Sequence, residues 1–238
     1  MTKILIILNI LLITAAVFLF IKGGFYKKTT EYFNSVLDKK DTYTFNMNIN
    51  YKIKNEQYMS YEGKSEVVMF GDSHTEMAEW TELLGRPGVI NRGISGDITE
   101  GMLNRIQSVV KADPKVCFVM GGINDVIRRV SYNKTVENIK NITLNLKQNG
   151  VQTVIQSVLF TGELYEDYVK INKSVKELNI ELEKFANEAG IHYLDLNSLL
   201  SERGKLRSEF SFDGLHLNPE GYRIWRRAVN DKLNTLEF

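Results

Sequence analysis

Cysteine and histidine, the side chains that form disulfides and bind zinc in small proteins, are scarce in this sequence. Among 238 residues there is one cysteine, Cys117, which excludes an internal disulfide. Because Cys117 lies inside the apolar run KVCFVM, we expect a small core residue rather than a reactive thiol. Three histidines, with no cysteine cluster or histidine-rich tract, offer no pattern for a structural zinc site, so we expect neither a metal nor another cofactor.

The sequence also lacks an excess of either charge. It has 30 Lys and Arg residues against 29 Asp and Glu residues, which gives a formal net charge of +1. Proteins that bind nucleic acid usually carry a basic excess on the binding domain. We therefore expect no nucleic-acid partner.

One segment, residues 4–21, contains no charged residue at all. Its sequence is ILIILNILLITAAVFLFI, which as a helix would extend over roughly 27 Å, close to the hydrocarbon thickness of a bilayer. The segment ends in VFLFIKGG, which lacks the small-residue cleavage site of a signal peptide. We therefore predict an uncleaved transmembrane anchor over residues 1–25, with a cleaved signal peptide as the alternative.

The lysines around this predicted anchor are compatible with two orientations. Lys3 precedes the apolar segment, and Lys22, Lys27 and Lys28 follow it. Counted strictly, the positive-inside rule favours a cytoplasmic domain after the anchor. A short basic flank before an apolar segment is also typical of a signal-anchor, which exports the rest of the chain. We expect the second arrangement, with an extracytoplasmic domain on a single-pass membrane anchor.

Residues 26–64 are predicted to connect the anchor to the main domain. Aromatic and leucine side chains between residues 26 and 37 are spaced for one face of a juxtamembrane helix. Residues 42–53, TYTFNMNINYKI, alternate apolar and polar side chains, which is typical of a half-buried strand. A second strand near residues 58–61 would complete a β-hairpin, and the alternative is a polar, asparagine-rich linker.

From residue 65 to 238, apolar runs alternate with amphipathic patterns. The runs cover 66–70, 88–90, 115–120, 151–159 and 191–195, and the helical patterns cover about 75–84, 98–111, 134–149 and 165–189. A final helix is predicted from Asn218, a capping residue followed by proline. Alternating strands and helices predict an α/β fold in which helices cover both faces of a parallel sheet.

Polar, glycine-containing turns follow three of these runs, and a fourth turn precedes the final helix. They are Gly71-Asp72-Ser73-His74, the segment 91–97 (NRGISGD), the segment 121–125 (GGIND) and Asp213-Gly214-Leu215-His216. In a parallel α/β sheet, ligands bind outside the carboxyl ends of the strands. These turns are therefore expected to meet at one edge of the sheet.

The same four blocks, in this order, resemble the SGNH (GDSL-type) hydrolase family. The matching residues are GDS at 71–73, Gly96 in ISGD, GxND at 122–125 and DxxH at 213–216, and the resemblance covers about residues 65–235. It implies a flavodoxin-like, three-layer α/β/α fold with a central parallel sheet of five strands. It also implies a serine ester hydrolase that works through an acyl-enzyme. His74 departs from the pattern, since the family often has leucine there.

The resemblance and the chemistry of the side chains together suggest roles for three residues. A serine hydroxyl needs a base to take its proton, and Ser73 is the candidate nucleophile. His192 lies in a strand pattern and is expected to be half-buried, while His74 is expected to face solvent or line the pocket. His216 is then the candidate base, and Asp213 can orient its imidazole. Two alternatives without catalysis remain. Ser73 could serve only as a helix cap, and Asp213 and His216 could belong to a turn that only caps the final helix.

The family pattern also implies donors for the oxyanion and suggests residues near the substrate. By resemblance, the backbone N–H groups of Ser73 and Gly96 and the amide of Asn124 would form the oxyanion hole. Alternatively, Gly96 could be only a turn glycine, and Asn124 could form only a local hydrogen bond within its turn. The candidates for lining the substrate pocket are Asp72, His74, Gly122 and Asp125, although we expect the two aspartates mainly to hold their loops. A metal site built from Asp72, His74, Asp125 and His216 is a further alternative that no ligand spacing supports.

The substrate is predicted only by class. The family includes carbohydrate O-deacetylases, lysophospholipases, thioesterases and acetylhydrolases of the platelet-activating-factor type. We expect removal of acetyl or other short acyl groups from a carbohydrate or small ester. The alternatives are hydrolysis of lipid acyl esters by a lysophospholipase or thioesterase, and a non-catalytic, membrane-anchored carbohydrate-binding module.

Overall fold

Five parallel strands form the central sheet of this protein, whose computed structural model describes residue 22 and residues 43–236. The strands are β1 (Val67–Gly71), β2 (Val89–Gly93), β3 (Val116–Met120), β4 (Gln152–Gln156) and β5 (His192–Leu194), and they lie in the order β2-β1-β3-β4-β5. Every residue of the interior strands β1 and β3 is buried, as expected of strands covered on both faces. The predicted five-stranded parallel sheet is confirmed.

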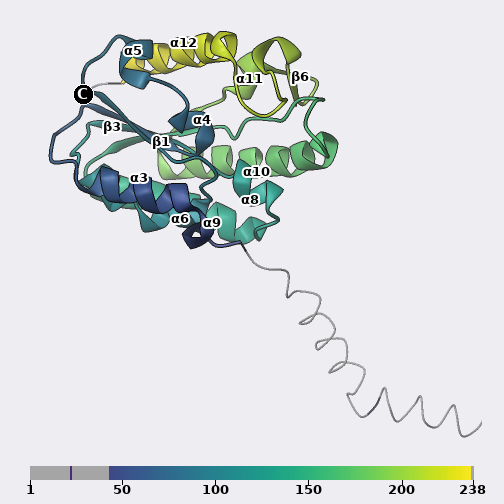
Figure 1. Ribbon diagram of the computed structural model, residues 1–238, viewed down its shortest axis with the longest axis horizontal. Coiled ribbons are helices and arrows are strands. Elements are labelled where there is room, and N and C mark those ends of the chain that lie inside the picture. The colour runs from purple at the N-terminus through teal and green to yellow at the C-terminus, as the bar shows by residue number, and fades with distance from the viewer. Residues whose placement is uncertain (1–21, 23–42, 237–238) are drawn as a thin grey trace, which may run out of the picture. The chain divides into compact units, whose positions relative to one another are not determined.

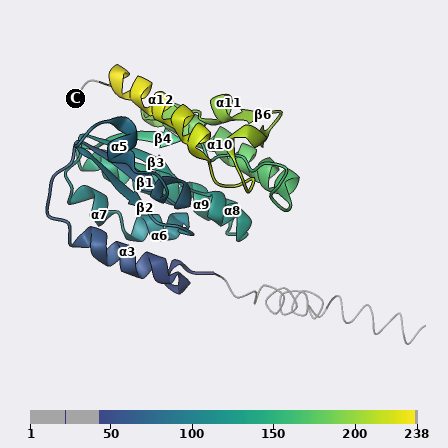
Figure 2. The same ribbon diagram turned by 45° about the horizontal axis from the view of Figure 1, so that its top comes forward.

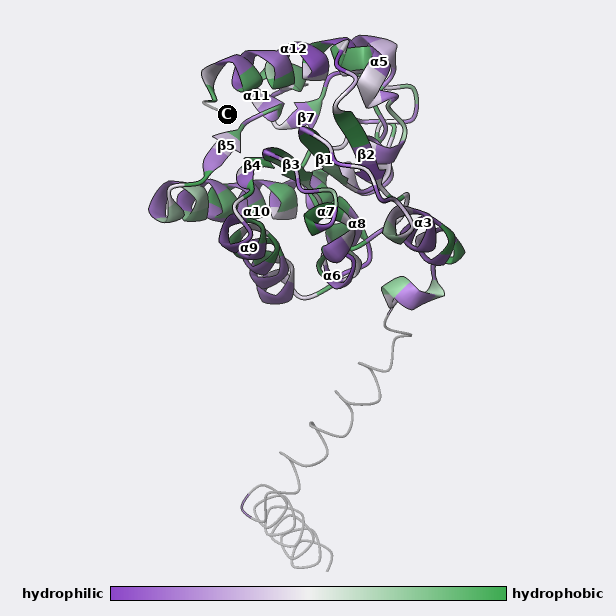
Figure 3. Ribbon diagram, turned by 90° about the vertical axis from the view of Figure 1, so that its left-hand side faces the viewer, coloured by the Kyte–Doolittle hydropathy of each residue, from purple (hydrophilic) through white to green (hydrophobic). Residues whose placement is uncertain are grey.

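Helices cover both faces of the sheet, which confirms the predicted three layers (Figures 1 and 3). One face packs against α5 (Trp80–Leu84), α11 (Asn197–Leu200) and α12 (Pro219–Thr235). The other packs against α6 (Thr99–Asn104), α7 (Gln107–Val110), α8 (Ile123–Ile127), α9 (Tyr132–Gln148) and α10 (Tyr168–Ala189). Cys117 lies in the second core cluster, and burial raises the pKa of its thiol.

Most helical patterns form helices near the expected positions, but two of them are split. The pattern at 75–84 forms α4 (Ser73–Glu76) and α5, and the pattern at 98–111 forms α6 and α7. After α4, the side-chain amide of Asn91 donates to the carbonyls of Thr75, Glu76 and Ala78 at 2.9, 3.1 and 2.9 Å. These bonds satisfy carbonyls that would otherwise need helical N–H partners, so the chain can leave the helix there.

The hairpin predicted between residues 42 and 61 is wrong. This stretch forms a 3-10 helix, η1 (Phe45–Met47), followed by the α-helix α3 (Ile49–Met59). The Asn48 side chain caps α3 by accepting from the N–H of Asn50 at 3.0 Å. The apolar side chains that alternate in the sequence are not on one buried face, since Met47 and Ile49 are 65% and 70% exposed.

Helix α3 belongs to the same compact unit as the sheet, and this unit begins at Tyr43. Helix α3 packs against α7, and η1 packs against α6 (Figure 2). The remaining elements are the short strands β6 (Ser201–Glu202) and β7 (Lys205–Leu206) and the 3-10 helix η2 (Ser208–Phe210).

In residue 22 and residues 43–236, no helix combines the length and the apolar character needed to cross a bilayer. The anchor predicted over residues 1–25 and the juxtamembrane helix predicted after it fall, apart from residue 22, outside the described residues.

Candidate active site

The four polar turns meet at the carboxyl end of the sheet. Ser73 is the first residue of α4, directly after β1 and Asp72. Gly96 follows β2, and Asn124 lies in α8, which follows β3. His216 lies in the loop that precedes α12. The topology therefore brings together residues that are up to 143 positions apart in the chain.

Ser73, His216 and Asp213 form a continuous chain of hydrogen bonds. The Oγ of Ser73 lies 3.2 Å from Nε2 of His216, and Nδ1 of His216 lies 2.7 Å from Oδ2 of Asp213. Although partial burial alone would raise it, hydrogen bonds from His216 and from the N–H of Leu215 lower the pKa of Asp213 to about 2. Asp213 is therefore ionised at neutral pH and fixes the imidazole with Nε2 toward the serine.

The loop that carries Asp213 and His216 is held by backbone contacts. Oδ1 of Asp213 accepts from the N–H groups of Leu215 and His216 at 2.8 and 2.7 Å. Gly214 has a φ of +78°, and a Cβ there would lie 2.7 Å from the backbone nitrogen of Tyr165. Only glycine fits this close approach, so the DxxH turn is pressed against the chain that follows β4.

The three predicted oxyanion donors lie after the carboxyl ends of β1, β2 and β3. Within residues 43–236, the backbone N–H groups of Ser73 and Gly96 have no hydrogen-bond partner. Asn124 donates from Nδ2 to the carbonyl of Asp97 at 2.9 Å, which leaves its second N–H available. This bond joins α8 to the loop after β2 rather than closing a local turn, and it holds the Asn124 amide against the residue that follows Gly96.

The residues predicted to line the pocket do not line it. Asp72, His74 and Asp125 are 0%, 1% and 0% exposed, and Gly122 is also buried. Asp72 caps α4 by accepting from the N–H of His74 at 3.0 Å. Asp125 accepts from the hydroxyl of Thr99 at 2.6 Å and from its N–H at 3.0 Å. Both aspartates hold loops, which agrees with the role expected for them.

His74 is a buried link between two loops rather than a solvent-facing or pocket-lining residue. Its Nδ1 lies 3.2 Å from Oδ1 of Asp72, and its Nε2 lies 2.9 Å from the carbonyl oxygen of Leu215. Both partners only accept hydrogen bonds, so both ring nitrogens must carry protons to satisfy them. Burial is the largest single influence and opposes the charge, but the hydrogen bond and charge of Asp72, the carbonyl of Leu215 and the charge of Asp213 together outweigh it and raise the pKa of His74. The link joins α4 to the loop of His216.

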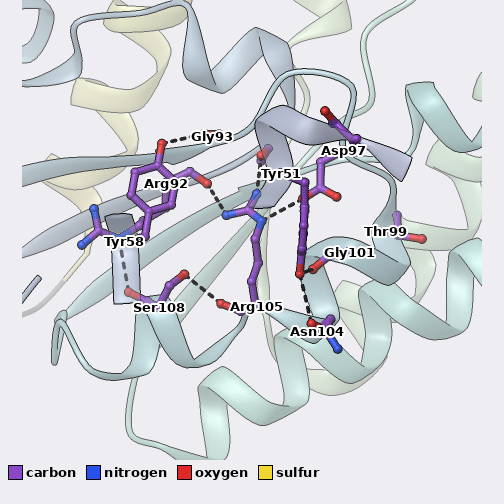
Figure 4. A network of polar contacts seen from close by, with 12 residues as sticks. Tyr51, Tyr58, Arg92, Gly93, Asp97, Thr99, Gly101, Asn104, Arg105 and Ser108 are labelled. Carbon is purple, nitrogen blue, oxygen red and sulfur yellow. Dashed lines mark hydrogen bonds and ion pairs between the residues drawn. The ribbon is translucent and has the colours of Figure 1, made fainter. Parts of the chain in front are cut away.

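A buried arginine that the sequence analysis missed supports the same edge of the sheet (Figure 4). Arg105 donates to the carbonyl of Gly71 at 2.7 Å, to the carbonyl of Arg92 at 2.7 Å and to Oδ2 of Asp97 at 2.8 Å. Burial raises the pKa of Asp97 to about 6, although Arg105 opposes this shift. The ion pair therefore ties the ends of β1 and β2 to the residue that follows Gly96.

The N-terminal segment also holds the loop around Gly96, which sequence reasoning did not anticipate. Tyr43 and Asn48 donate to the carbonyls of Gly96 and Ser95 at 3.2 and 2.7 Å. The hydroxyls of Tyr51 and Tyr58 donate to the carbonyls of Gly101 and Gly93 at 3.2 and 2.7 Å, respectively. The spacing of Tyr51 and Tyr58, seven residues apart, was the helical signal in this segment.

Two other features lie away from the relay. His192 is the first residue of β5, at the amino end of the strand, and it is exposed rather than half-buried as expected. A cavity of about 640 Å³ lies between α8, α9 and α10, and neither Ser73 nor His216 lines it. In the part of the chain from 43 to 236, no group of three or more His, Cys, Asp or Glu side chains is placed to hold a metal ion.

Two groups of known proteins are similar to this chain in sequence. The N-acylneuraminate cytidylyltransferase of Streptococcus agalactiae serotype V is 28% identical over 119 residues, which are 50% of this chain and 28% of that protein. The chain therefore corresponds to less than a third of the length of that relative. The human platelet-activating factor acetylhydrolase IB subunit alpha1 is 27% identical over 183 residues, or 73% of this chain and 78% of that protein.

Solved structures show the same fold. A GDSL-like lipase from Bacteroides thetaiotaomicron superposes with a TM-score of 0.68 at 23% identity, covering 78% of this chain and 97% of that one. An acetylxylan esterase from Geobacillus stearothermophilus gives a TM-score of 0.59 at 19% identity, covering 74% and 97%.

A family model matches a larger part of the sequence than the first relative does. The model of the GDSL-like lipase/acylhydrolase family matches residues 69–224, more than half of the chain, and this range includes Ser73, Gly96, Asn124, Asp213 and His216. The chain therefore belongs to the GDSL-like lipase/acylhydrolase (SGNH hydrolase) family.

Proposed function

We propose that the protein cleaves esters through a covalent acyl-enzyme on Ser73. The observation that carries this proposal is the unbroken chain from Ser73 Oγ through His216 to the ionised Asp213. Ser73 Oγ attacks the ester carbonyl carbon and passes its proton to Nε2 of His216. The resulting oxyanion accepts from the free N–H groups of Ser73 and Gly96 and from the amide of Asn124.

The remaining steps use the same proton carrier. His216 gives its proton to the alcohol oxygen as the carbon–oxygen bond breaks, and the alcohol leaves. A water molecule then attacks the acyl carbon, gives a proton to His216 and releases the carboxylic acid, while Ser73 Oγ recovers its proton. Asp213 stays ionised throughout and stabilises the imidazolium.

Removal of Ser73 tests this proposal. Ser73→Ala is expected to abolish hydrolysis of a small acetyl ester, and a serine-directed phosphonate should label the wild-type protein at Ser73. Ser131→Ala is the matched control, because Ser131 is exposed and its hydroxyl makes no capping bond to α9. Full activity in Ser73→Ala would refute the mechanism, and a folded wild-type protein without an adduct would favour the carbohydrate-binding module instead.

For the substrate, we propose acetyl or other short acyl groups on a carbohydrate or small ester. A relative at 27% identity is a platelet-activating factor acetylhydrolase, and a structural neighbour is an acetylxylan esterase, so both names specify acetyl removal. Lysolipid hydrolysis is the second candidate. Acetate release from acetylated glycans, measured beside fatty-acid release from lysolipids, separates the two.

The membrane anchor and the extracytoplasmic location remain predictions from residues 1–25. We expect the full chain to stay with membranes through a carbonate wash and the domain to be cleaved by protease added to intact cells. Recovery of the full chain in the soluble fraction would contradict the anchor.

A further inference from the structure

An exposed arginine lies beside the proposed oxyanion donors. Arg128 follows α8 and lies four residues after Asn124. A Cβ built on Gly96 would lie 3.5 Å from Nη2 of Arg128 and 3.3 Å from Nδ2 of Asn48. With standard bond lengths, an oxyanion held by the Gly96 N–H would be no more than about 9 Å from this guanidinium. A cation and an amide therefore flank the glycine whose N–H is free.

Arg128 has no acidic partner within residues 43–236. Among the exposed arginines of this range, Arg207 and Arg223 pair with Glu209 and Glu220, whereas Arg129, Arg203, Arg226 and Arg227, like Arg128, form no salt bridge there. Arg128 instead contacts the ring of Tyr43, with Cζ 3.6 Å from the ring centroid. Stacking occupies the face of a guanidinium and leaves the N–H groups at its edge free for an external acceptor.

The aromatic platform under Arg128 is fixed to the same loop. The Tyr43 hydroxyl donates to the carbonyl of Gly96 at 3.2 Å, so ring, guanidinium and glycine form one unit. Burial raises the pKa of Tyr43, which keeps the phenol neutral beneath the cation. Asp97, the acid that follows Gly96, is committed to Arg105, and Asp125, three residues before Arg128, is buried and accepts from Thr99. The positive charge of Arg128 is therefore not neutralised by these neighbours.

We propose that Arg128 binds an anionic group, a carboxylate or a phosphate, on the alcohol part of the ester substrate. This inference rests on the proposed function and narrows its substrate class to acyl esters of acidic sugars or of phosphate-bearing alcohols. An acetyl group carries no charged substituent, so the anionic group must belong to the alcohol part of the ester. A planar guanidinium edge suits both groups, because each offers two oxygens to parallel N–H donors.

Two matched ester pairs test the proposal. One pair is an acetylated methyl glucuronoside and its neutral methyl ester, and the other is acetylglycerol phosphate and neutral acetylglycerol. The wild-type protein is expected to favour the anionic member of at least one pair in kcat/KM. Arg128→Gln should lower that preference roughly tenfold or more, the usual range for a lost hydrogen bond to a charged group. Arg128→Lys should keep part of the preference, since it retains the charge without the planar edge.

The control is Arg227→Gln, which removes the same charge from an exposed position on α12. It should keep the wild-type preference, and added salt should weaken that preference in the wild type but not in Arg128→Gln. The ester pair whose anionic preference falls in Arg128→Gln shows whether Arg128 binds a carboxylate or a phosphate. Equal losses for anionic and neutral esters in Arg128→Gln would overturn the proposal in favour of a structural role, as would a wild type without anionic preference.

Failure of the proposed function would look different from failure of this inference. If the function were wrong, wild type and Ser73→Ala would be equally active or equally inactive on every ester, neutral ones included. That result would remove the catalytic mechanism and the inference with it. Activity on neutral esters that depends on Ser73, without any anionic preference, would overturn the role of Arg128 alone.

Discussion

At the scale of single residues, the site contains two histidine–aspartate pairs with opposite surroundings. The side chains of His216 and Asp213 are partly exposed, at 27% and 54%, and His216 contacts the hydroxyl of Ser73. His74 and Asp72 are each 1% accessible and touch no hydroxyl of a candidate nucleophile. Because a buried carboxylate needs a partner, the second pair serves to keep the loops in place. The centroids of the two imidazole rings lie 5.6 Å apart.

Because His74 is charged when protonated, the stability that the His74–Asp72 pair contributes depends on pH. Asp72, Asp213 and the carbonyl of Leu215 raise the pKa of His74 above its ordinary 6.5, against the effect of burial. A histidine with a raised pKa in the folded state stabilises the fold fully below its unfolded pKa, and this stabilisation is lost as the pH rises through the folded value. The link between α4 and the loop of His216 is therefore strongest in mildly acidic solution.

We predict that His74→Leu lowers the free energy of unfolding by about 1–3 kcal/mol at pH 6, since the buried Asp72 carboxylate loses its charged imidazole partner and keeps the backbone N–H of residue 74. The difference from wild type should shrink as the pH rises from 6 to 9. Denaturant titrations at several pH values measure it. His192→Gln is the control, because it removes an exposed imidazole far from these loops. A constant difference across this pH range would show that His74 is not charged in the folded protein.

At the scale of elements, α3 and η1 act on the loop between β2 and α6. Four side chains of residues 43–58 donate to backbone carbonyls between Gly93 and Gly101. Lys54 and Asn50 also contact the carboxylate of Glu76, which accepts from the N–H of Ser95 at 2.5 Å. The segment therefore orients the N–H of Gly96 through the carbonyls on either side of it.

We predict that Asn48→Ala lowers kcat for a small acetyl ester on the order of tenfold, because small displacements of a positioned donor are costly to the transition state. KM should change less, since Asn48 acts through the loop. The variant also loses the cap of α3, so activity is measured well below its melting temperature. Asn133→Ala, at an exposed position of α9, is the control. An unchanged kcat would show that the contact between Asn48 and the loop of Gly96 does not affect the reaction.

At the scale of the whole molecule, the sequence predicts what depends on local pattern and misses what depends on distant partners. The strands were predictable because buried parallel strands are continuous apolar runs, and their carboxyl ends placed Ser73, Gly96 and Asn124 together. The segment 42–53 was predicted wrongly because alternation cannot reveal that Met47 and Ile49 are exposed. The role of His74 was missed because its partner Leu215 lies 141 positions away.

The same limit applies to the charged residues of the site. Arg105 lies within a helical pattern, where an arginine normally faces solvent, yet it bonds to Gly71, 34 positions earlier in the chain. Arg128 was not distinguished from the exposed arginine beside it, because its contact with Tyr43 spans two elements that the sequence analysis placed in separate parts of the protein.

Cys117 allows a test of whether these elements unfold as one unit. It is the one cysteine of the chain, it is 0% exposed in β3, and burial raises the pKa of its thiol. We predict that a thiol reagent labels the folded protein only through global opening, so that the free energy from labelling equals that from denaturant titration. Asn48→Ala should lower both values equally if α3 unfolds together with the sheet. Faster labelling than the global free energy allows would show that the sheet opens locally at β3, and the coupling between α3 and the core would then be absent.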